Sequence, residues 1–310
     1  MQIKNNILRF SSSLLTPHTS QAFTMEITPS PEWEELREAL LREGGTTLLL
    51  GATDSGKSTL ARWLVGSMIA AGTAVALVDA DVGQSALCLP GTVGMALFRA
   101  PHDVAEYRCG EFSFLGSANA ARIIPALTGA TGRLAARARH EATAVIIDTT
   151  GLIDGIPGVA LKVGKIRETR PDRVVAIQRE GECEPILSRL GSTQVYRLLP
   201  SPHVTRRSPE ARARRRRMRL AAYFARAPLT EALVHAEDAE FFRLGRRIEL
   251  PQGPPPGGAV IGLNRGEVTL ALGIVTEADG ESVAFSSHLL SPREVNGVVF
   301  GDITLTDAVD

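Results

Sequence analysis

Gly51-Ala-Thr-Asp-Ser-Gly-Lys-Ser-Thr59 is the stretch of this 310-residue chain that decides its fold. It has the pattern G-x-x-x-x-G-K-[ST], which is a specific signal when it lies between a strand and a helix. The sequence predicts both neighbours: residues 46–50 are a short apolar run typical of a strand, and after Lys57 apolar residues recur at helical spacing. Glycines let backbone N–H groups turn onto phosphate oxygens, and the helix amino terminus favours negative charge. The stretch therefore predicts a nucleoside triphosphate site.

The residues expected to hold the triphosphate lie in this loop. The positions predicted to contact ATP are Gly51, Thr53, Asp54, Ser55, Gly56, Lys57, Ser58 and Thr59. Lys57 is expected to reach the β- and γ-phosphates, and the Ser58 hydroxyl is a candidate Mg²⁺ ligand. The alternative is a glycine-rich turn that binds nothing. The loop by itself predicts a triphosphate but no particular reaction.

The strands around the loop predict the fold class. Apolar runs recur at residues 74–78, 144–147 and 173–177, separated by helical stretches. Continuous apolar strands of this kind indicate a parallel sheet covered on both faces. We therefore expect an α/β fold with a doubly wound, mainly parallel P-loop NTPase sheet. In such a fold the ligand binds at the carboxyl ends of the strands.

The chain is expected to contain three parts. Residues 1–30 are predicted to be a disordered tail, with a transit-like segment or an upstream start ahead of Met25 as alternatives. Residues 31–250 are predicted to form the P-loop domain, which begins with an amphipathic helix and carries a lid at about 203–225. A proline- and glycine-rich linker starts at Pro251, and glycine turns between short β-like runs follow it. We therefore predict a small β-rich domain at 251–310.

Composition narrows the function classes. The 34 basic and 34 acidic residues cancel, so net charge does not decide whether the partner is a polyanion. No run of about 18 apolar residues occurs, so no membrane association is expected. Cys88, Cys109 and Cys183 are far apart in the sequence and are predicted to be reduced thiols of a cytoplasmic protein. The histidines show no metal-ligand spacing.

Two acids and an amide follow the second predicted strand, in Val78-Asp-Ala-Asp-Val-Gly-Gln84. A hydroxyl is a poor nucleophile at neutral pH, so a kinase needs a carboxylate that orients the acceptor and takes its proton. Asp81 is predicted to be this base, and Asp79 is predicted to position the loop or a Mg²⁺-bound water. The alternative is that both acids only cap a turn.

A third acid competes for the metal. Asp148 ends the third predicted strand, in Ile147-Asp-Thr-Thr-Gly151, as an acid directly after an apolar run. The candidate Mg²⁺ residues are thus Ser58, Asp79 and Asp148, and spacing does not decide which carboxylate contacts the ion.

Eight arginines and one glutamate lie between Arg206 and Arg219. Ser208 followed by Pro209 is typical of a helix start, and Arg212, Arg216 and Arg219 then share one face. The arginines could form a lid over the γ-phosphate, grip nucleic-acid phosphates, or make up a solvated basic face. The use of Arg rather than Lys favours the first two, because Arg suits bidentate phosphate contact.

These motifs, with Pro90-Gly-Thr-Val-Gly94, together resemble the polynucleotide 5′-hydroxyl kinase family over about residues 45–225, and the archaeal members most. The family includes the kinase subunit of the eukaryotic pre-mRNA cleavage complex. The resemblance implies transfer of the γ-phosphate of ATP, with Mg²⁺, to the 5′-OH end of RNA or DNA. It also implies that Asp81 and Gln84 engage the acceptor hydroxyl. Arg207, Arg212 and Arg216 match the lid arginines that contact the transferring phosphate. The sequence does not indicate which proteins, if any, bind this chain.

One position departs from the family. Members usually carry Trp after the glycine of the D-T-x-G motif, where it stacks on the terminal base, and here the residue is Leu152, which has no π-face. Substrate contacts are expected at Ser117, Thr149 and Leu152, with a helix N-cap as the first interpretation of Ser117. The other function classes are a non-catalytic ATP-binding scaffold and a P-loop ATPase or GTPase. The intact Lys57 and Asp81 favour the kinase.

Overall fold

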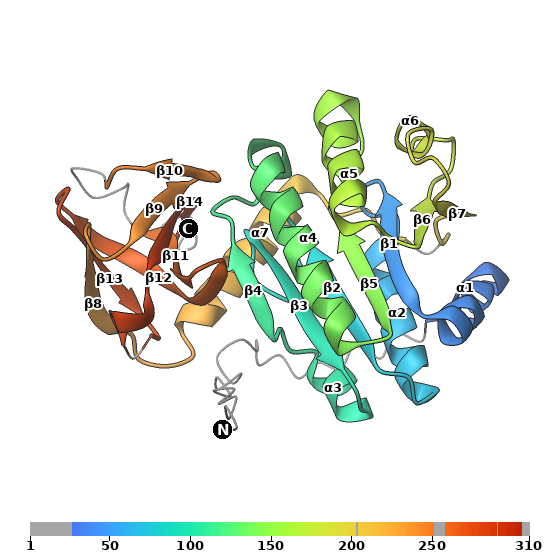
Figure 1. The fold of residues 1–310 in the computed structure, drawn as a ribbon, viewed down its shortest axis with the longest axis horizontal. Helices are drawn as coiled ribbons and strands as arrows, with labels where there is room; N and C mark the ends of the chain where they lie inside the picture. The colour runs from blue at the N-terminus through green and yellow to red at the C-terminus, as the bar shows by residue number, and fades with distance from the viewer. Residues whose placement is uncertain (1–26, 203, 251–257, 290, 306–310) are drawn as a thin grey trace, which may run out of the picture.

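The computed structural model describes residues 27–202, 204–250, 258–289 and 291–305. Residues 1–26 of the tail predicted at 1–30, and residues 251–257 of the linker, lie outside the described residues, whereas Ile27 packs against the core. Two sheets lie side by side, with helices packed on the larger α/β unit (Figure 1).

The central sheet has seven strands in the order β4-β3-β2-β5-β1-β6-β7. The four predicted strands are confirmed as β1 Gly45–Gly51, β2 Val75–Ala80, β5 Ala144–Thr149 and β6 Arg173–Ile177. The strands at the sheet edges are β3 Thr92–Phe98, β4 Glu111–Phe114 and β7 Gln194–Leu198. β1, β2, β5, β6 and β7 run parallel, whereas β3 and β4 pair antiparallel at one edge. The expected mainly parallel sheet is thus confirmed.

Helices cover both faces of this sheet. The longer helices are α1 Pro31–Glu43, α2 Lys57–Ala70, α4 Ile124–Glu141, α5 Gly155–Thr169 and α7 Pro209–Phe224. The short ones are α3 Pro101–Glu106, α6 Glu184–Leu187 and η2 Ala120–Arg122, whereas η3 Pro292–Glu294 lies between two strands of the second sheet. Because side chains alternate along a strand, Leu49 packs with α1 and α2 while Leu48 and Leu50 pack with α4 and α5. Figure 1 shows α4 and α5 in front of the sheet and α2 behind it.

The second sheet corrects the predicted domain boundary. Its order is β10-β9-β14-β11-β12-β13-β8. The strands are β8 Thr230–His235, β9 Glu240–Arg243, β10 Arg246–Ile248, β11 Ala259–Arg265, β12 Val268–Ala278, β13 Ser282–Ser287 and β14 Gly297–Thr304. Since three strands before Pro251 belong to this sheet, the boundary predicted at 250/251 is wrong. The β domain begins soon after α7, and the proline-rich stretch connects two of its own strands.

The two units are joined by hydrogen bonds from β4 and α7 to β12. The Phe114 N–H donates to Thr269 Oγ1 at 2.8 Å, and the Leu272 N–H donates to the buried Tyr223 hydroxyl at 3.0 Å. The β domain therefore buttresses the helix that carries the predicted lid. No helix in the described part of the chain is long and apolar enough to span a bilayer.

Candidate active site

The phosphate loop joins β1 to α2, as the sequence predicts. Gly56 has φ +100° and directly precedes Lys57, the first residue of α2. Lys57 is buried, and its ammonium donates to the Ala52 carbonyl at 2.7 Å and lies 3.3 Å from Ser55 Oγ. Burial lowers the pKa of Lys57, against the opposing influence of Asp148. The ammonium thus lies within the loop that would surround a triphosphate.

Two of the predicted metal residues, Ser58 and Asp148, lie in contact with each other. Ser58 Oγ, in the first turn of α2, donates at 2.5 Å to Oδ2 of Asp148, which lies near the end of β5. Asp148 Oδ1 is buried and has no hydrogen-bond partner among the described residues. Burial, and then the neighbouring Asp79, raise the pKa of Asp148 to about 7. A hydroxyl beside a carboxylate with an unpaired buried oxygen is a donor set that suits Mg²⁺.

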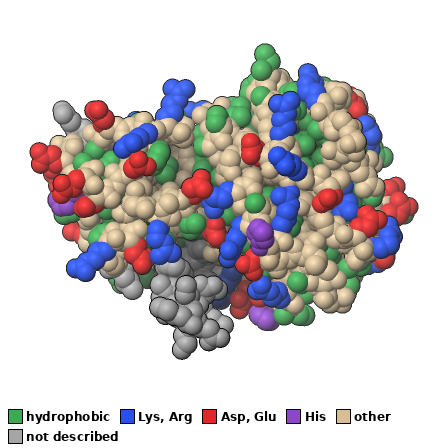
Figure 2. Space-filling model, viewed as in Figure 1, with side chains coloured by type: hydrophobic (Ala, Val, Ile, Leu, Met, Phe, Trp, Pro, Cys, Tyr) green, Lys and Arg blue, Asp and Glu red, His purple; other side chains and the backbone are tan. Residues whose placement is uncertain are grey.

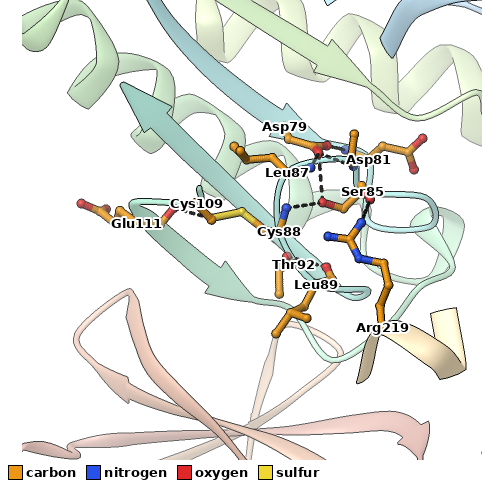
Figure 3. Close-up of a disulfide and its surroundings, with 11 residues drawn as sticks. Asp79, Asp81, Ser85, Leu87, Cys88, Leu89, Thr92, Cys109, Glu111 and Arg219 are labelled. Carbon is orange, nitrogen blue, oxygen red and sulfur yellow. Dashed lines mark hydrogen bonds between the residues drawn. A yellow bond between two sulfur atoms is a disulfide. The ribbon is translucent and has the colours of Figure 1, made fainter. Parts of the chain in front are cut away.

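Asp79 is engaged on both carboxylate oxygens by the loop that follows β2. Oδ2 accepts from Ser85 Oγ and from the Ala86 and Leu87 N–H groups at 2.7 to 2.9 Å, while Oδ1 accepts from the Asp81 N–H at 3.1 Å (Figure 3). Burial raises the pKa of Asp79. Because its oxygens already accept these bonds, the geometry favours Asp148 over Asp79 as the metal ligand. Asp79 organises residues 81–91, which we call the acceptor loop.

Asp81 and Gln84 are brought together at the start of the acceptor loop. Asp81 Oδ1 accepts the Gly83 and Gln84 N–H groups, both at 3.0 Å. No hydrogen bond to Oδ2 occurs within the described chain, so that oxygen is available to a ligand. Gln84 Nε2 donates to the Gly83 carbonyl at 2.7 Å, and its Oε1 is buried without a partner in the described residues. An oriented carboxylate beside an amide can hold an incoming hydroxyl.

The arginine-rich segment forms α7 and packs over the phosphate loop. Ser208 caps the helix by accepting the Ala211 N–H at 3.2 Å. Asp54, in the left-handed region at φ +56°, accepts the Arg207 N–H at 3.1 Å and lies 3.3 Å from Arg212 Nη1. The Arg216 guanidinium is half-buried. Of the predicted lid arginines, Arg212 and Arg207 thus contact the phosphate loop directly, through a carboxylate.

Comparison with known proteins assigns the family. Residues 51–226 match the family described as mRNA cleavage and polyadenylation factor CLP1 P-loop. The chain belongs to this family. The matched residues include the phosphate loop, both acid motifs and α7, so the predicted resemblance is confirmed.

Curated relatives of this CLP1-family chain carry kinase names. A polyribonucleotide 5′-hydroxyl-kinase of Pyrococcus horikoshii is 31% identical over 174 residues, which is 54% of this chain and 47% of the relative. One from Methanocaldococcus jannaschii is 35% identical over 144 residues, 45% of this chain and 39% of the relative. Clp1 of Xenopus tropicalis, of the same kinase name, is 28% identical over 279 residues, 85% and 62% of the two chains. The chain spans about half the length of the archaeal relatives.

A solved structure shares the fold. The wild-type Clp1p–Pcf11p (454–563) complex matches with a TM-score of 0.65 and 11% identity, over 88% of this chain and 78% of that chain. At this identity the match supports the architecture alone.

The three predicted substrate residues lie in different environments. Ser117 is buried and donates to Asp302 of the β domain at 2.9 Å, and Asn119 rather than Ser117 caps the following η2 turn. Thr149 is also buried, with its hydroxyl donating to the Leu49 carbonyl at 2.7 Å. In this structure both hydroxyls make internal contacts. Leu152 is half-buried against the α4/α5 core.

Steric crowding explains why the last residue of the D-T-T-G motif, Gly151, is glycine. A Cβ on Gly151 would lie 2.3 to 2.4 Å from atoms of Thr53 in the phosphate loop. The chain after β5 can therefore pass against the phosphate loop only without a side chain at this position.

The prediction of reduced thiols is wrong for two of the three cysteines of this CLP1-family chain. Cys88 in the acceptor loop forms a disulfide with Cys109, which precedes β4 (Figure 3). Cys183 is free and buried. The two lie 21 residues apart in sequence, but the β3 hairpin brings their Cα atoms within 5.5 Å. A Cβ on Gly94 of β3 would lie 2.0 Å from Cys88 Sγ, so glycine makes room for the bridge.

Sequence reasoning assigned no role to two buried lysines of α5, Lys162 and Lys165, although their segment is similar to the archaeal family pattern. Lys165 donates to the Ala80 carbonyl at 2.9 Å, between the two acids of the acceptor motif. Lys162 donates to Thr149 Oγ1 at 2.6 Å and to the Thr150 carbonyl. Burial lowers the pKa of Lys165 to about 7. Their i, i+3 spacing on an otherwise apolar helix face was the available signal.

Proposed function

We propose that the protein is an ATP-dependent polynucleotide 5′-hydroxyl kinase that transfers the γ-phosphate of ATP to the 5′-OH end of RNA or DNA. The observation that carries the proposal is Asp81, whose Oδ1 is fixed by two N–H groups while Oδ2 has no bond in the described chain. It lies in the loop after β2, the strand that pairs with β5, which carries Asp148. The kinase names of the relatives agree with this proposal.

The chain's own residues account for each part of the reaction. Lys57 would leave the Ala52 carbonyl for the β- and γ-phosphates. Ser58 and Asp148 would hold Mg²⁺, which when bound neutralises charge on the phosphates. Asp81 would orient the acceptor hydroxyl and take its proton. Arg207, Arg212 and Arg216 would stabilise the charge that develops on the transferring group.

The ion pair between Arg212 and Asp54 would hold the lid at the phosphate loop when no nucleotide is bound. Arg212 Nη1 lies 3.3 Å from Asp54 Oδ2 above the phosphate loop. The Asp54 carboxylate is an oxyanion, as the γ-phosphate is, and both can pair with a guanidinium. Asp54 would therefore hold Arg212 at the loop before the nucleotide binds. ATP would then compete with Asp54 for this guanidinium.

The proposal is tested by incubating the purified protein with γ-labelled ATP, Mg²⁺ and 5′-OH oligonucleotides of RNA and of DNA. We expect label at the 5′ end of at least one acceptor, and none with Lys57→Ala. Tight ATP binding without any labelled oligonucleotide would overturn the kinase and support a scaffold. Release of labelled phosphate at a rate independent of oligonucleotide would instead support an ATPase. A cytoplasmic location stays part of the proposal, to be checked by fractionation.

A further inference from the structure

A basic recess lies on the acceptor side of α7, away from the Asp54 contact. Arg215, Arg216 and Arg219 line it from the helix. Gly83, Gln84, Ser85 and Pro90 of the acceptor loop line it from the other side. Arg219 is fixed there by donating to the Ser85 carbonyl (Figure 3).

The arginines of this recess make no close ion pair with a described carboxylate, although Asp79 and Asp81 lie near enough to offset part of the lowering of their pKa values by burial. Within the described residues, no carboxylate lies within 4.0 Å of Arg215, Arg216 or Arg219, whereas Arg212 has Asp54. All three are half-buried. Burial, and then repulsion from neighbouring arginines, lower the pKa values of Arg215 and Arg216 and bring that of Arg219 to about 10. In contrast, Figure 2 shows basic and acidic side chains intermingled over the face in view.

Partly desolvated guanidinium groups are costly unless an anion pairs with them. The recess therefore favours a ligand with negative charge, and Arg favours a planar or tetrahedral oxyanion that can accept two N–H groups. A phosphodiester has this chemistry.

The recess is close to the proposed base. Gly83 and Gln84, which line it, are the residues whose N–H groups hold Asp81 Oδ1 at 3.0 Å. A 5′-OH acceptor carries its first phosphate on the 3′ oxygen of the same nucleotide, one sugar away from the reacting hydroxyl. That phosphate would reach the recess when the hydroxyl is at Asp81.

We propose that Arg215, with Arg219 beside it, binds the first internucleotide phosphate of the acceptor. The inference rests on the proposed kinase function and adds a subsite to it. Arg215 is not among the lid arginines implied by the family resemblance. The subsite would favour a polynucleotide end over a free nucleoside and would recognise charge rather than base identity.

The test compares two acceptors that differ only at the first linkage: a normal phosphodiester and an uncharged methylphosphonate. With the wild-type protein we expect the methylphosphonate to raise the acceptor KM about tenfold. Arg215→Ala should raise the KM for the phosphodiester by a similar factor, raise that for the methylphosphonate little, and leave the KM for ATP unchanged. The slope of log KM against log salt for the phosphodiester should fall by about 0.7.

Arg214 provides the matched control, because it lies on the same helix with the same charge but is exposed. Arg214→Ala should change both acceptors alike. Equal KM increases with both acceptors for Arg215→Ala, or no increase at all, would overturn the subsite. Arg215→Lys, which keeps the charge, should recover part of the discrimination and guards against a folding defect. Failure of the wild-type protein to phosphorylate the phosphodiester acceptor would instead refute the kinase itself.

Discussion

The two halves of the site are built differently. The phosphate side is mostly local: the loop residues are consecutive, Asp148 is added from the strand beside β1, and Arg207 and Arg212 contact the loop at Asp54. The acceptor side is held by the neighbouring Asp79 and by three residues that are distant in sequence. Asp79 of β2, Cys109 before β4, Lys165 of α5 and Arg219 of α7 all bind residues 80–91. The comparison teaches that nucleotide binding and acceptor positioning depend on separate sets of contacts.

The largest effect should come from substitutions that separate these halves. Asp81→Asn removes the proton acceptor but keeps an oxygen for the Gly83 and Gln84 N–H groups, so the loop should persist. Transfer should fall by about 10² to 10⁴-fold, while the Kd for ATP changes little. Lys57→Ala should abolish transfer and also weaken ATP binding. Single-turnover labelling and calorimetric titration with ATP measure the two quantities. A large loss of ATP affinity in Asp81→Asn would move Asp81 to the metal.

Asp79→Asn should have the second largest effect. An amide presents one acceptor oxygen and an NH₂ group, so it cannot satisfy donors on both sides as the carboxylate does. Unpaired buried donors cost about 1–3 kcal/mol, and we expect a comparable loss of unfolding free energy. The acceptor KM should rise about tenfold or more, with the ATP Kd within about twofold of wild type. Denaturant unfolding and acceptor kinetics check this prediction. Weakened ATP binding at constant acceptor KM would contradict the organising role of Asp79.

The disulfide should have a smaller effect on transfer than Asp79. Replacing Cys88 and Cys109 by Ser together removes a bridge of 21-residue separation, and bridges of this span contribute about 3 kcal/mol. We expect a lower Tm and an acceptor KM raised a few-fold, because Cys88 lies in the acceptor loop and its N–H donates to Ser85 Oγ at 2.8 Å. ATP affinity should not change.

A substitution at Gly94 tests the bridge without changing a cysteine, and Gly66 provides the matched control. Gly94→Ala would place a methyl 2.0 Å from Cys88 Sγ, so thiol titration should detect two extra thiols in the denatured variant. Gly66→Ala, on α2 with nothing within 4 Å, should leave the bridge intact. Three titratable thiols in the denatured wild-type protein would contradict the bridge.

The local half of the site is also the half that could be predicted from sequence. The loop of Gly51 to Thr59 and the apolar strands ending at Asp79 and Asp148 specify their neighbours, because parallel strands align their carboxyl ends. Contacts between distant residues have no such signal. The cysteine pair, the Asp302 partner of Ser117 and the Lys165 contact all depend on how elements pack after folding. The domain boundary failed for a related reason, since a proline-rich linker does not say which strands it joins.

Lys165 allows the smallest and most selective test of the acceptor side. Its pKa is about 7 in the folded protein, lowered by burial from an ordinary value of 10.5. Between pH 7 and 10.5 the unfolded chain therefore binds more protons than the folded one, so this lysine makes stability rise with pH, by at most about 1.4 kcal/mol per unit. Lys165→Met removes that contribution. The Tm of wild type relative to the variant should thus increase from pH 7.5 to pH 9.5. A difference in Tm that stays constant over this range would show that Lys165 remains charged in the fold, and that its bond to the Ala80 carbonyl is that of an ammonium.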